Sequence, residues 1–347
     1  MSGSAPAQPS DSVILSGFKG IRNTVAADRL APDELERGQN IDLDDVGAVR
    51  SRRGYTLVAA GDFHSVYTVG GTTYGVKDGS LGIIRPDYTF ETLQAGVGAD
   101  PVAYVAVGDS VYFSSRAASG IIVDGTVDAW GAQVSPVEWH SPVINPTTTL
   151  GAIAGKSLGA PPMATALTAY NGRIYLAQGS TLWATELFLY RYVDKTRTFF
   201  QLEDEITVLG AVSDGVYVGT RSRLYFLAGN AFAEMRLEQV QMFGALPGSM
   251  VDLPADLILP NQSTTKAGLM VMTTGGLCAC QDGGAVYNLT QTQVLFPEAT
   301  SAAAMFRQQD GVNQYVGALN SAGTPTSSAR IGDYVDAEIR RFTGASP

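Results

Sequence analysis

From about residue 57 onward, short runs rich in Val, Ile, Tyr and Leu alternate with turns built from Gly, Asp and Asn. Residues 64–85 show the pattern, with three apolar runs separated by Gly70-Gly71 and by Asp78-Gly79. β-branched and aromatic residues favour strands, and two-residue turns of this composition join antiparallel strands into hairpins. The pattern therefore predicts a chain of antiparallel meanders.

The meander recurs along the chain. Matching the central aromatic residue of each copy, or the residue in its place, gives Tyr74, Tyr112, Tyr175, Tyr217, Met270 and Tyr315. The intervals between them are 38, 63, 42, 53 and 45 residues, and four of the five lie close to the roughly 40–50 residues of a four-stranded propeller blade. The longest interval contains a Pro-rich insertion at about 131–163. We interpret the matched aromatic residues as core or inter-blade packing.

One meander cannot bury its apolar face alone, whereas several packed in a ring can, and ring closure also shields the sheet edges. The repeats therefore predict an all-β fold, namely a β-propeller of about six blades with an N-terminal extended arm. A two-sheet sandwich, or tandem β-domains divided at the Pro-rich insertion, is the alternative.

The predicted organisation has four parts. They are a flexible tail at 1–12, an N-terminal arm or docking segment at 13–60, the propeller at 61–335 and a C-terminal tail at 336–347. Within the arm, Pro32 to Gly38 predicts one or two helical turns, with Pro at the first position and Gly past the end.

Composition narrows the range of functions. Only 16% of the residues are charged and the net charge is −10, whereas roughly a quarter is usual. An acidic chain repels phosphate on average, which argues against nucleic-acid binding over the whole surface. Two His residues leave little room for a His-based metal centre or triad, and no phosphate-binding loop or Cys-x-x-Cys is present. We therefore expect no enzyme activity and no cofactor.

Targeting signals are not recognisable in the sequence. The N-terminus has no basic residue before Lys19, and no apolar run approaches the roughly 20 residues of a membrane span. We expect a protein that is made in a cytoplasm and has no membrane-spanning segment. Cys278 and Cys280 are two residues apart on a predicted strand, so they share a face and are expected to be reduced core thiols.

Residues 17–56 carry a more specific signature. It runs from Gly-Phe-Lys-Gly-Ile-Arg-Asn at 17–23, through Gln-Asn-Ile-Asp at 39–42, to Gly-Ala-Val-Arg-Ser-Arg-Arg-Gly-Tyr at 47–55. This segment resembles the N-terminal signature of tail proteins of short-tailed bacteriophages. The family comprises tail hub or nozzle proteins, also called packaged-DNA stabilisation or tail tubular proteins. The family pattern often has Pro before the final Gly, where this chain has Arg53.

The resemblance implies a virion structural protein of a phage tail. Such proteins assemble as a six-fold ring below the portal and adaptor, and the ring extends and closes the DNA channel. The implied partners are other copies of the chain, the adaptor and portal, other tail proteins or fibres, and double-stranded DNA that passes without specific binding. The implied location is the virion, after assembly in the host bacterial cytoplasm. The subunit or adaptor docking residues suggested by the segment are Phe18, Arg22, Asn40, Asp42, Arg50, Arg52, Arg53 and Tyr55.

Two rival functions remain open from the sequence. A propeller glycosidase needs two carboxylates about 5–10 Å apart facing one cavity, and the chain offers several acids without a way to pair them. These acids include Glu186, Glu203, Asp204 and Glu205. A carbohydrate-binding propeller is the second rival, because Trp and Tyr side chains can stack on sugars.

Overall fold

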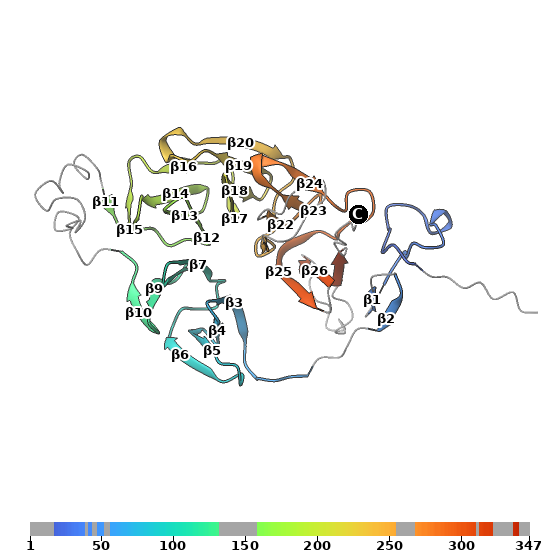
Figure 1. The fold of residues 1–347 in the computed structure, drawn as a ribbon, viewed down its shortest axis with the longest axis horizontal. Coiled ribbons are helices and arrows are strands. Elements are labelled where there is room, and N and C mark those ends of the chain that lie inside the picture. The colour runs from blue at the N-terminus through green and yellow to red at the C-terminus, as the bar shows by residue number, and fades with distance from the viewer. Residues whose placement is uncertain are drawn as a thin grey trace, which may run out of the picture.

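The computed structural model describes residues 17–38, 41–43, 47–51, 56–131, 158–254, 268–309, 312–321 and 336–339. Six antiparallel sheets follow one another around a common centre, and an N-terminal arm lies beside the last of them (Figure 1). The predicted tail at 1–12 and most of the Pro-rich insertion lie outside the described residues.

The first two blades are four-stranded meanders in chain order. Blade 1 consists of β3 (Phe63–Val69), β4 (Thr72–Lys77), β5 (Ser80–Ile84) and β6 (Phe90–Gln94). Blade 2 consists of β7 (Ala103–Val107), β8 (Ser110–Ser114), β9 (Ser119–Val123) and β10 (Thr126–Ala129). In both blades the first strand lies nearest the centre of the ring (Figure 1).

Blade 3 is larger. Its strands are β11 (Leu158–Gly159), β12 (Ala166–Tyr170), β13 (Arg173–Gln178), β14 (Thr181–Glu186), β15 (Leu189–Asp194) and β16 (Phe199–Gln201). β14 pairs with β16 over residues 181–183 and with β15 at Thr185 and Glu186, and the register with β15 shifts between these two residues. The end of the Pro-rich insertion contributes β11, which pairs with β15.

The remaining sheets complete the circuit. Blade 4 has β17 (Ile206–Val212), β18 (Gly215–Thr220), β19 (Leu224–Ala228), the 3-10 turn η3 (Phe232–Glu234) and β20 (Arg236–Gln241). Blade 5 has β21 (Val251–Leu253), β22 (Gly268–Thr273), β23 (Gly276–Cys280), η4 (Asp282–Gly284) and β24 (Val286–Asn288). The sixth sheet has β25 (Ala299–Gln309), β26 (Val312–Ser321) and β27 (Asp336–Ile339).

The prediction of an all-β propeller is confirmed, and the sandwich and tandem-domain alternatives do not describe the fold. The number of blades differs from the prediction. Five sheets have at least four strands, and the sixth has three described strands. Its last strand, β27, begins at Asp336, so this sheet extends past the boundary predicted at residue 335. Neighbouring sheets touch in chain order, through β3 and β7, β7 and β12, β12 and β17, β17 and β22, and β21 and β25.

The turn chemistry explains why the meanders form. Asp78-Gly79, Asp124-Gly125 and Asn171-Gly172 all have positive φ at both residues, with values of 49° and 74°, 49° and 74°, and 45° and 73°. Two successive positive φ angles define the turn whose twist matches paired strands, and Asp, Asn and Gly are the residues that adopt it at low cost. The hairpins predicted at these dipeptides are confirmed.

The matched repeat positions also agree with the structure. Each of the six lies on the second strand of its meander, namely β4, β8, β13, β18, β22 and β26, where the meander of blade 3 begins at β12. Tyr175, Tyr217 and Tyr315 are at most 1% exposed, and each hydroxyl contacts a neighbouring blade. Tyr217 donates to the carbonyls of Gln281 and Ala285 in blade 5. The repeat alignment therefore identified positions that join blades.

The arm contains η1 (Ala27–Arg29), β1 (Ile41–Leu43) and β2 (Val49–Ser51). The helix predicted from Pro32 to Gly38 does not form. Residues 32 and 33 make a turn, and Leu35 then forms a parallel bridge with Ile21. Pairing with a distant segment therefore overrode the local preference of this stretch.

Two smaller expectations can be compared with the structure. Cys278 and Cys280 are free and fully buried, as expected. Burial raises the pKa of the Cys278 thiol to about 11, so the group is protonated at neutral pH. Within the described residues, no helix combines the length and the apolar character that crossing a membrane would require.

Candidate functional site

The N-terminal arm is held together by its own hydrogen bonds and ion pairs. The amide of Phe18 donates to the carbonyl of Gly47 at 2.9 Å, which joins the start of the arm to the β1–β2 hairpin. Lys19 Nζ lies 2.6 Å from Asp33 Oδ2. The hydrogen bond between them raises the pKa of Lys19 and lowers the pKa of Asp33. The arm is therefore a small folded unit and not an extended strand alone.

Arg22 and Glu34 form the most enclosed ion pair of the arm. Arg22 Nη1 lies 2.9 Å from Glu34 Oε1, and Glu34 Oε2 accepts a hydrogen bond from the amide of Ala31 at 3.1 Å. The amide hydrogen bond and Arg22 both lower the pKa of Glu34. This guanidinium therefore stabilises the arm itself, and the docking role predicted for Arg22 stays a prediction.

Asp42 and Arg50 are directly opposite each other in the β1–β2 ladder. Opposite charges at facing positions of an antiparallel pair stabilise the pair modestly. Both residues are part of the predicted docking set, and the structure brings them together through strand register.

The eight predicted docking residues have different outcomes. Phe18, Arg22, Asp42 and Arg50 are described, and all four belong to the folded arm. The other four lie outside the described residues: Asn40, Arg52, Arg53 and Tyr55. The docking role stays a prediction for all eight residues.

A residue that the prediction omitted makes the contact between the arm and the propeller. Asn23 Nδ2 donates to the carbonyl of Leu295 at 3.0 Å, and Asn23 Oδ1 accepts from the amide of Leu295 at 2.7 Å. The amide of Asn23 donates to the carbonyl of Gln293 at 3.0 Å, and Thr24 Oγ1 donates to the carbonyl of Thr292 at 2.9 Å. The arm therefore binds the connection between β24 and β25. Asn23 is the last residue of the Gly-Phe-Lys-Gly-Ile-Arg-Asn motif, and its place in this motif was the sequence signal that could have identified it.

The dock lies on one particular face of the propeller. Because successive strands are antiparallel, the connections between blades lie on the same face as the turns between second and third strands. We call this surface the linker face. Exposed apolar side chains in these connections and in the segment before β3 include Leu57 at 83%, Val58 at 59%, Met163 at 46%, Met242 at 75%, Phe243 at 37% and Leu295 at 65% exposure. These side chains belong to different connections around the ring, and single exposed apolar residues are ordinary on protein surfaces.

Several charged residues near the connection between blades 3 and 4 form ion pairs. Glu205 bridges Arg116 at 2.9 Å and Arg221 at 2.6 Å, which links a turn of blade 2 to a turn of blade 4. Arg223 lies 3.1 Å from Glu203. Two of the acids named as catalytic candidates in the glycosidase alternative are thus committed to surface ion pairs.

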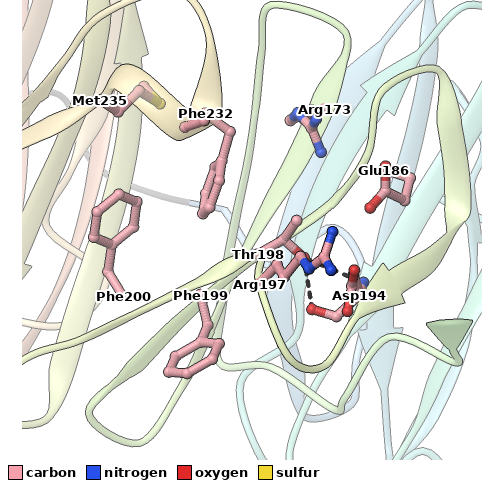
Figure 2. Close-up of a pocket in the computed structure, with 10 residues that line it drawn as sticks. Arg173, Glu186, Asp194, Arg197, Thr198, Phe199, Phe200, Phe232 and Met235 are labelled. Carbon is pink, nitrogen blue, oxygen red and sulfur yellow. Dashed lines mark hydrogen bonds between the residues drawn. The ribbon is translucent and has the colours of Figure 1, made fainter. Parts of the chain in front are cut away.

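A pocket of about 370 Å³ lies between the outer part of blade 3 and η3 of blade 4. Its lining comprises Arg173, Glu186, Asp194, Arg197, Thr198, Phe199, Phe200, Phe232, Ala233 and Met235. Figure 2 shows the rings of Phe200 and Phe232 on one side and Glu186 with Asp194 on the other. The two walls therefore differ in chemical character.

The aromatic wall is built from β16 and η3. The rings of Phe200 and Phe232 have centroids 5.0 Å apart, and the ring of Phe199 lies 5.3 Å from that of Trp183. The Arg173 guanidinium lies over the Phe232 ring at 5.6 Å. Cations attract the faces of aromatic rings, so this contact helps to fix the ring.

The polar wall is held by the turn between β15 and β16. Asp194 Oδ1 accepts hydrogen bonds from the amide and hydroxyl of Thr196, at 3.0 and 2.7 Å. The Asp194 carbonyl accepts from the amides of Arg197 and Thr198, at 3.2 and 3.0 Å (Figure 2). Asp194 is 1% exposed and Glu186 is 4% exposed. The turn therefore fixes the wall while leaving Arg197 exposed at the rim.

Among the described residues no group of three or more His, Cys, Asp or Glu side chains is placed to hold a metal ion. Glu186 and Asp194 do line one pocket, which is one of the two conditions for a glycosidase. Asp194 uses one carboxylate oxygen to hold its own turn, so it acts as a structural residue.

Comparisons with known proteins give similarity in fold only. No protein-family model matches the chain, and no curated protein matches it. The extracellular domain of a putative hybrid two-component system from B. thetaiotaomicron matches with 10% identity and a TM-score of 0.46, over 77% of this chain and 33% of that one. This chain thus spans about a third of that domain. The N-terminal domain of Nup159 matches with 8% identity and a TM-score of 0.45, over 75% and 74% of the two chains.

Proposed function

We propose that this chain is a virion structural protein of a short-tailed phage tail, in which the propeller builds the wall of a ring and the arm docks on a neighbour or on the adaptor. The proposal begins from the resemblance of residues 17–56 to the signature of that family. The observation that carries it is the hydrogen-bonded contact of Asn23 and Thr24 with Thr292–Leu295.

This contact suits an assembly protein for a physical reason. Asn23 forms hydrogen bonds with the backbone N–H and C=O of Leu295, and the same backbone groups are present in every copy of the chain. An arm that folds by itself can therefore occupy the same dock on its own chain or on an adjacent copy. Exchange of such elements between identical subunits is a low-cost route to oligomers.

The linker face supplies a surface for further partners. It carries exposed apolar side chains, including Met242 and Leu295, and ion pairs that join Glu205 to Arg221 and Glu203 to Arg223. Exposed apolar side chains gain free energy when they are covered, and subunit interfaces are depleted in charge at their centres. We assign this face to contacts with neighbouring copies, the adaptor and portal, or other tail proteins and fibres.

The sixth sheet is proposed as the sixth blade. β25 packs against β21, as β7 packs against β3 and β17 against β12, and the buried Tyr315 takes the position of the matched aromatic residues. Its hydroxyl donates to the carbonyl of Ser249 in the connection before blade 5, at 2.7 Å. This equivalence in position supports the count of about six.

The proposed ring places the acidic chain around a DNA channel. A net charge of −10 weakens any grip on phosphate, which suits a wall that DNA passes without specific binding. The ring would retain packaged DNA until ejection. The expected location is the virion, and no catalytic step is assigned to the protein.

Assembly with its neighbours tests this function. The purified full chain is mixed with the cognate portal and adaptor, and the products are measured by solution mass and by negative-stain microscopy. The proposal expects six-fold particles that incorporate the chain. An Asn23→Ala variant should incorporate poorly, whereas Asn320→Ala, at an exposed position of β26, should incorporate normally.

Two results would overturn the proposal. One is a monomeric chain that never forms six-fold particles at any concentration or with the portal and adaptor present. The other is a virion micrograph in which labelled protein is absent from the tail.

A further inference from the structure

We propose that residues 56–58 add to the sixth sheet as its fourth strand and thereby close the propeller onto blade 1. In the structure these residues lead into β3 and lie outside the strands. The sixth sheet has three described strands, and β27 at its outer edge pairs with β26. The proposal concerns contacts within a single chain, so it is independent of assembly with the portal and adaptor.

The order of strands along the chain places residues 56–58 in this role. Elsewhere the last strand of one blade comes directly before the first strand of the next, as β6 comes before β7 and β20 before β21. The nearest parallel is β16 (Phe199–Gln201), which is followed by residues 202–205 and then by β17. Residues 56–58 are followed in the same way by residues 59–62 and then by β3. In a closed propeller the sheet before blade 1 is the sixth sheet, so its last strand is expected at this point.

The side chains of this segment suit a strand that packs inside a blade. Leu57 and Val58 are 83% and 59% exposed in the structure. β-branched residues such as Thr56 and Val58 favour strands, and neighbouring residues of a strand point to opposite faces. On the sixth sheet, Leu57 and Val58 would therefore each extend one face, and burial of both apolar side chains favours the paired state.

Blade 1 leaves an apolar side chain uncovered on the face that would meet the sixth sheet. Tyr67 packs in the core cluster that blades 1 and 2 share. Val66, the residue before it, faces the other way and lies beside Gly75. Val66 is 59% exposed, whereas Leu167 and Val208, on the first strands of blades 3 and 4, are 8% and 4% exposed. This innermost strand therefore lacks the cover that the other blades have.

The sixth sheet has a matching uncovered side chain. Ala304 and Phe306 pack in the core cluster that blade 5 and the sixth sheet share. Met305 lies between them on β25, so it faces away from blade 5, and it is 56% exposed. Val66 and Met305 therefore lie on the two faces that meet when the sixth sheet packs on blade 1. Contact between these faces buries both side chains, which favours closure.

The chain itself couples the added strand to the closed joint. The arm is already bound to residues 292–295, directly before β25, so it lies beside the sixth sheet (Figure 1). When residues 56–58 pair with β27, residues 59–62 alone connect them to β3, which draws blade 1 towards the sixth sheet. Both contacts belong to one chain and so form at a high effective concentration. The added strand also covers a sheet edge, and uncovered edges promote aggregation.

Hydrogen exchange of the unmodified full chain tests the added strand. The amides of residues 56–58 should exchange at least about a hundredfold more slowly than in an unfolded peptide of the same sequence. Leu57→Asp should restore fast exchange here, because a charged side chain opposes burial. Phe188→Asp is the control, since Phe188 is 70% exposed on a turn of blade 3, and it should leave the exchange slow. Exchange of residues 56–58 at the unfolded rate in the unmodified chain would overturn the proposal.

Cross-linking tests the closure of the joint. A chain that carries Val66→Cys and Met305→Cys, treated with a short bis-maleimide, should become linked within single chains. Addition of Leu57→Asp should reduce this linkage at least about fivefold, because the local concentration of the two faces falls. Val66→Cys with Met242→Cys is the control pair and should not be linked within a chain, because Met242 lies in the connection between blades 4 and 5.

Two results of the cross-linking would contradict the proposal. Linkage found only between copies assigns Val66 and Met305 to a contact between subunits. Linkage within the chain that is unchanged by Leu57→Asp shows that the joint closes without residues 56–58.

Discussion

The side chain of Asn23 pairs with both backbone groups of Leu295, donating from Nδ2 at 3.0 Å and accepting at Oδ1 at 2.7 Å. The two residues are separated by most of the propeller along the chain, yet they fix the arm to the connection between blades 5 and 6. An amide side chain mimics a peptide group, so it satisfies the exposed edge of this connection as a short strand would. Both hydrogen bonds use backbone groups of Leu295, so neither depends on the identity of its side chain.

The first prediction concerns this amide. Asn23→Ala removes two side-chain hydrogen bonds, each worth about 0.5–1.5 kcal/mol, so the arm should leave its dock more often. Trypsin should then cleave at the exposed Arg29 several times faster, while the thermal unfolding of the propeller changes little. Asn320→Ala should leave the cleavage rate unchanged. Equal cleavage of wild type and Asn23→Ala would show that the hydrogen bonds do not hold the arm.

The second prediction asks which chain provides the dock. Thr24→Cys combined with Thr292→Cys places two thiols at the contact between Thr24 Oγ1 and the carbonyl of residue 292. A short bis-maleimide should join subunits into covalent multimers when the arm is exchanged, as seen on a denaturing gel. Linkage within single chains alone would contradict exchange.

The native thiols do not interfere with this cross-linking measurement. Cys278 and Cys280 are fully buried, and burial raises the pKa of Cys278 to about 11. Thiolate is the reactive form, so these groups stay inert near neutral pH. The unmodified chain, treated in the same way, is the control.

The third prediction concerns Gly47 in the arm. Its φ is +76°, and an added Cβ would lie 2.6 Å from the backbone of Gly17 and Phe18. Gly47→Ala should therefore open the hydrogen bond from the Phe18 amide to the carbonyl of residue 47, at a cost of about 1–3 kcal/mol. Hydrogen exchange at the Phe18 amide should become faster. Gly70→Ala has a similar φ of +57° with nothing within 4 Å, so it should leave the arm unaffected.

The fourth prediction concerns the joint between blades 4 and 5. The buried Tyr217 hydroxyl donates to the carbonyls of Gln281 and Ala285, the latter at 3.0 Å, and burial raises the pKa of this phenol. Tyr217→Phe should lower the free energy of unfolding by about 1–2 kcal/mol, because a buried acceptor loses its donor. Denaturant unfolding measures the change. Tyr287→Phe on β24 is the control, and an equal loss there would assign the effect to general packing.

Particular residues show how much of the fold could be predicted from the sequence. The dipeptides Asp78-Gly79 and Asn171-Gly172 fixed their hairpins locally, because few other residues adopt two successive positive φ angles. The matched tyrosines located the second strand of each sheet, because a repeated structure requires the same large side chain at the same depth. The prediction of a helix after Pro32 was wrong, because this segment instead forms a bridge to Ile21, which is distant along the chain.

The candidate sites could be predicted only in part. The motif identified the arm. Within it, Arg22 forms an ion pair with Glu34, whereas the adjacent Asn23 makes the contact with the propeller. The pocket was not predictable from sequence. Phe232 and Asp194 come from different blades, and only the packing of one blade on the next brings them to one cavity.

The sequence by itself determined the all-β class, the meander repeat and the positions that join blades. These features arise from short-range preferences and from a repeated pattern of burial, which are both written in local composition. The tertiary structure alone decided how the described strands divide among the sheets, where the arm docks, and which side chains share a pocket. These features depend on contacts between segments far apart in the chain, and no local pattern encodes those distances.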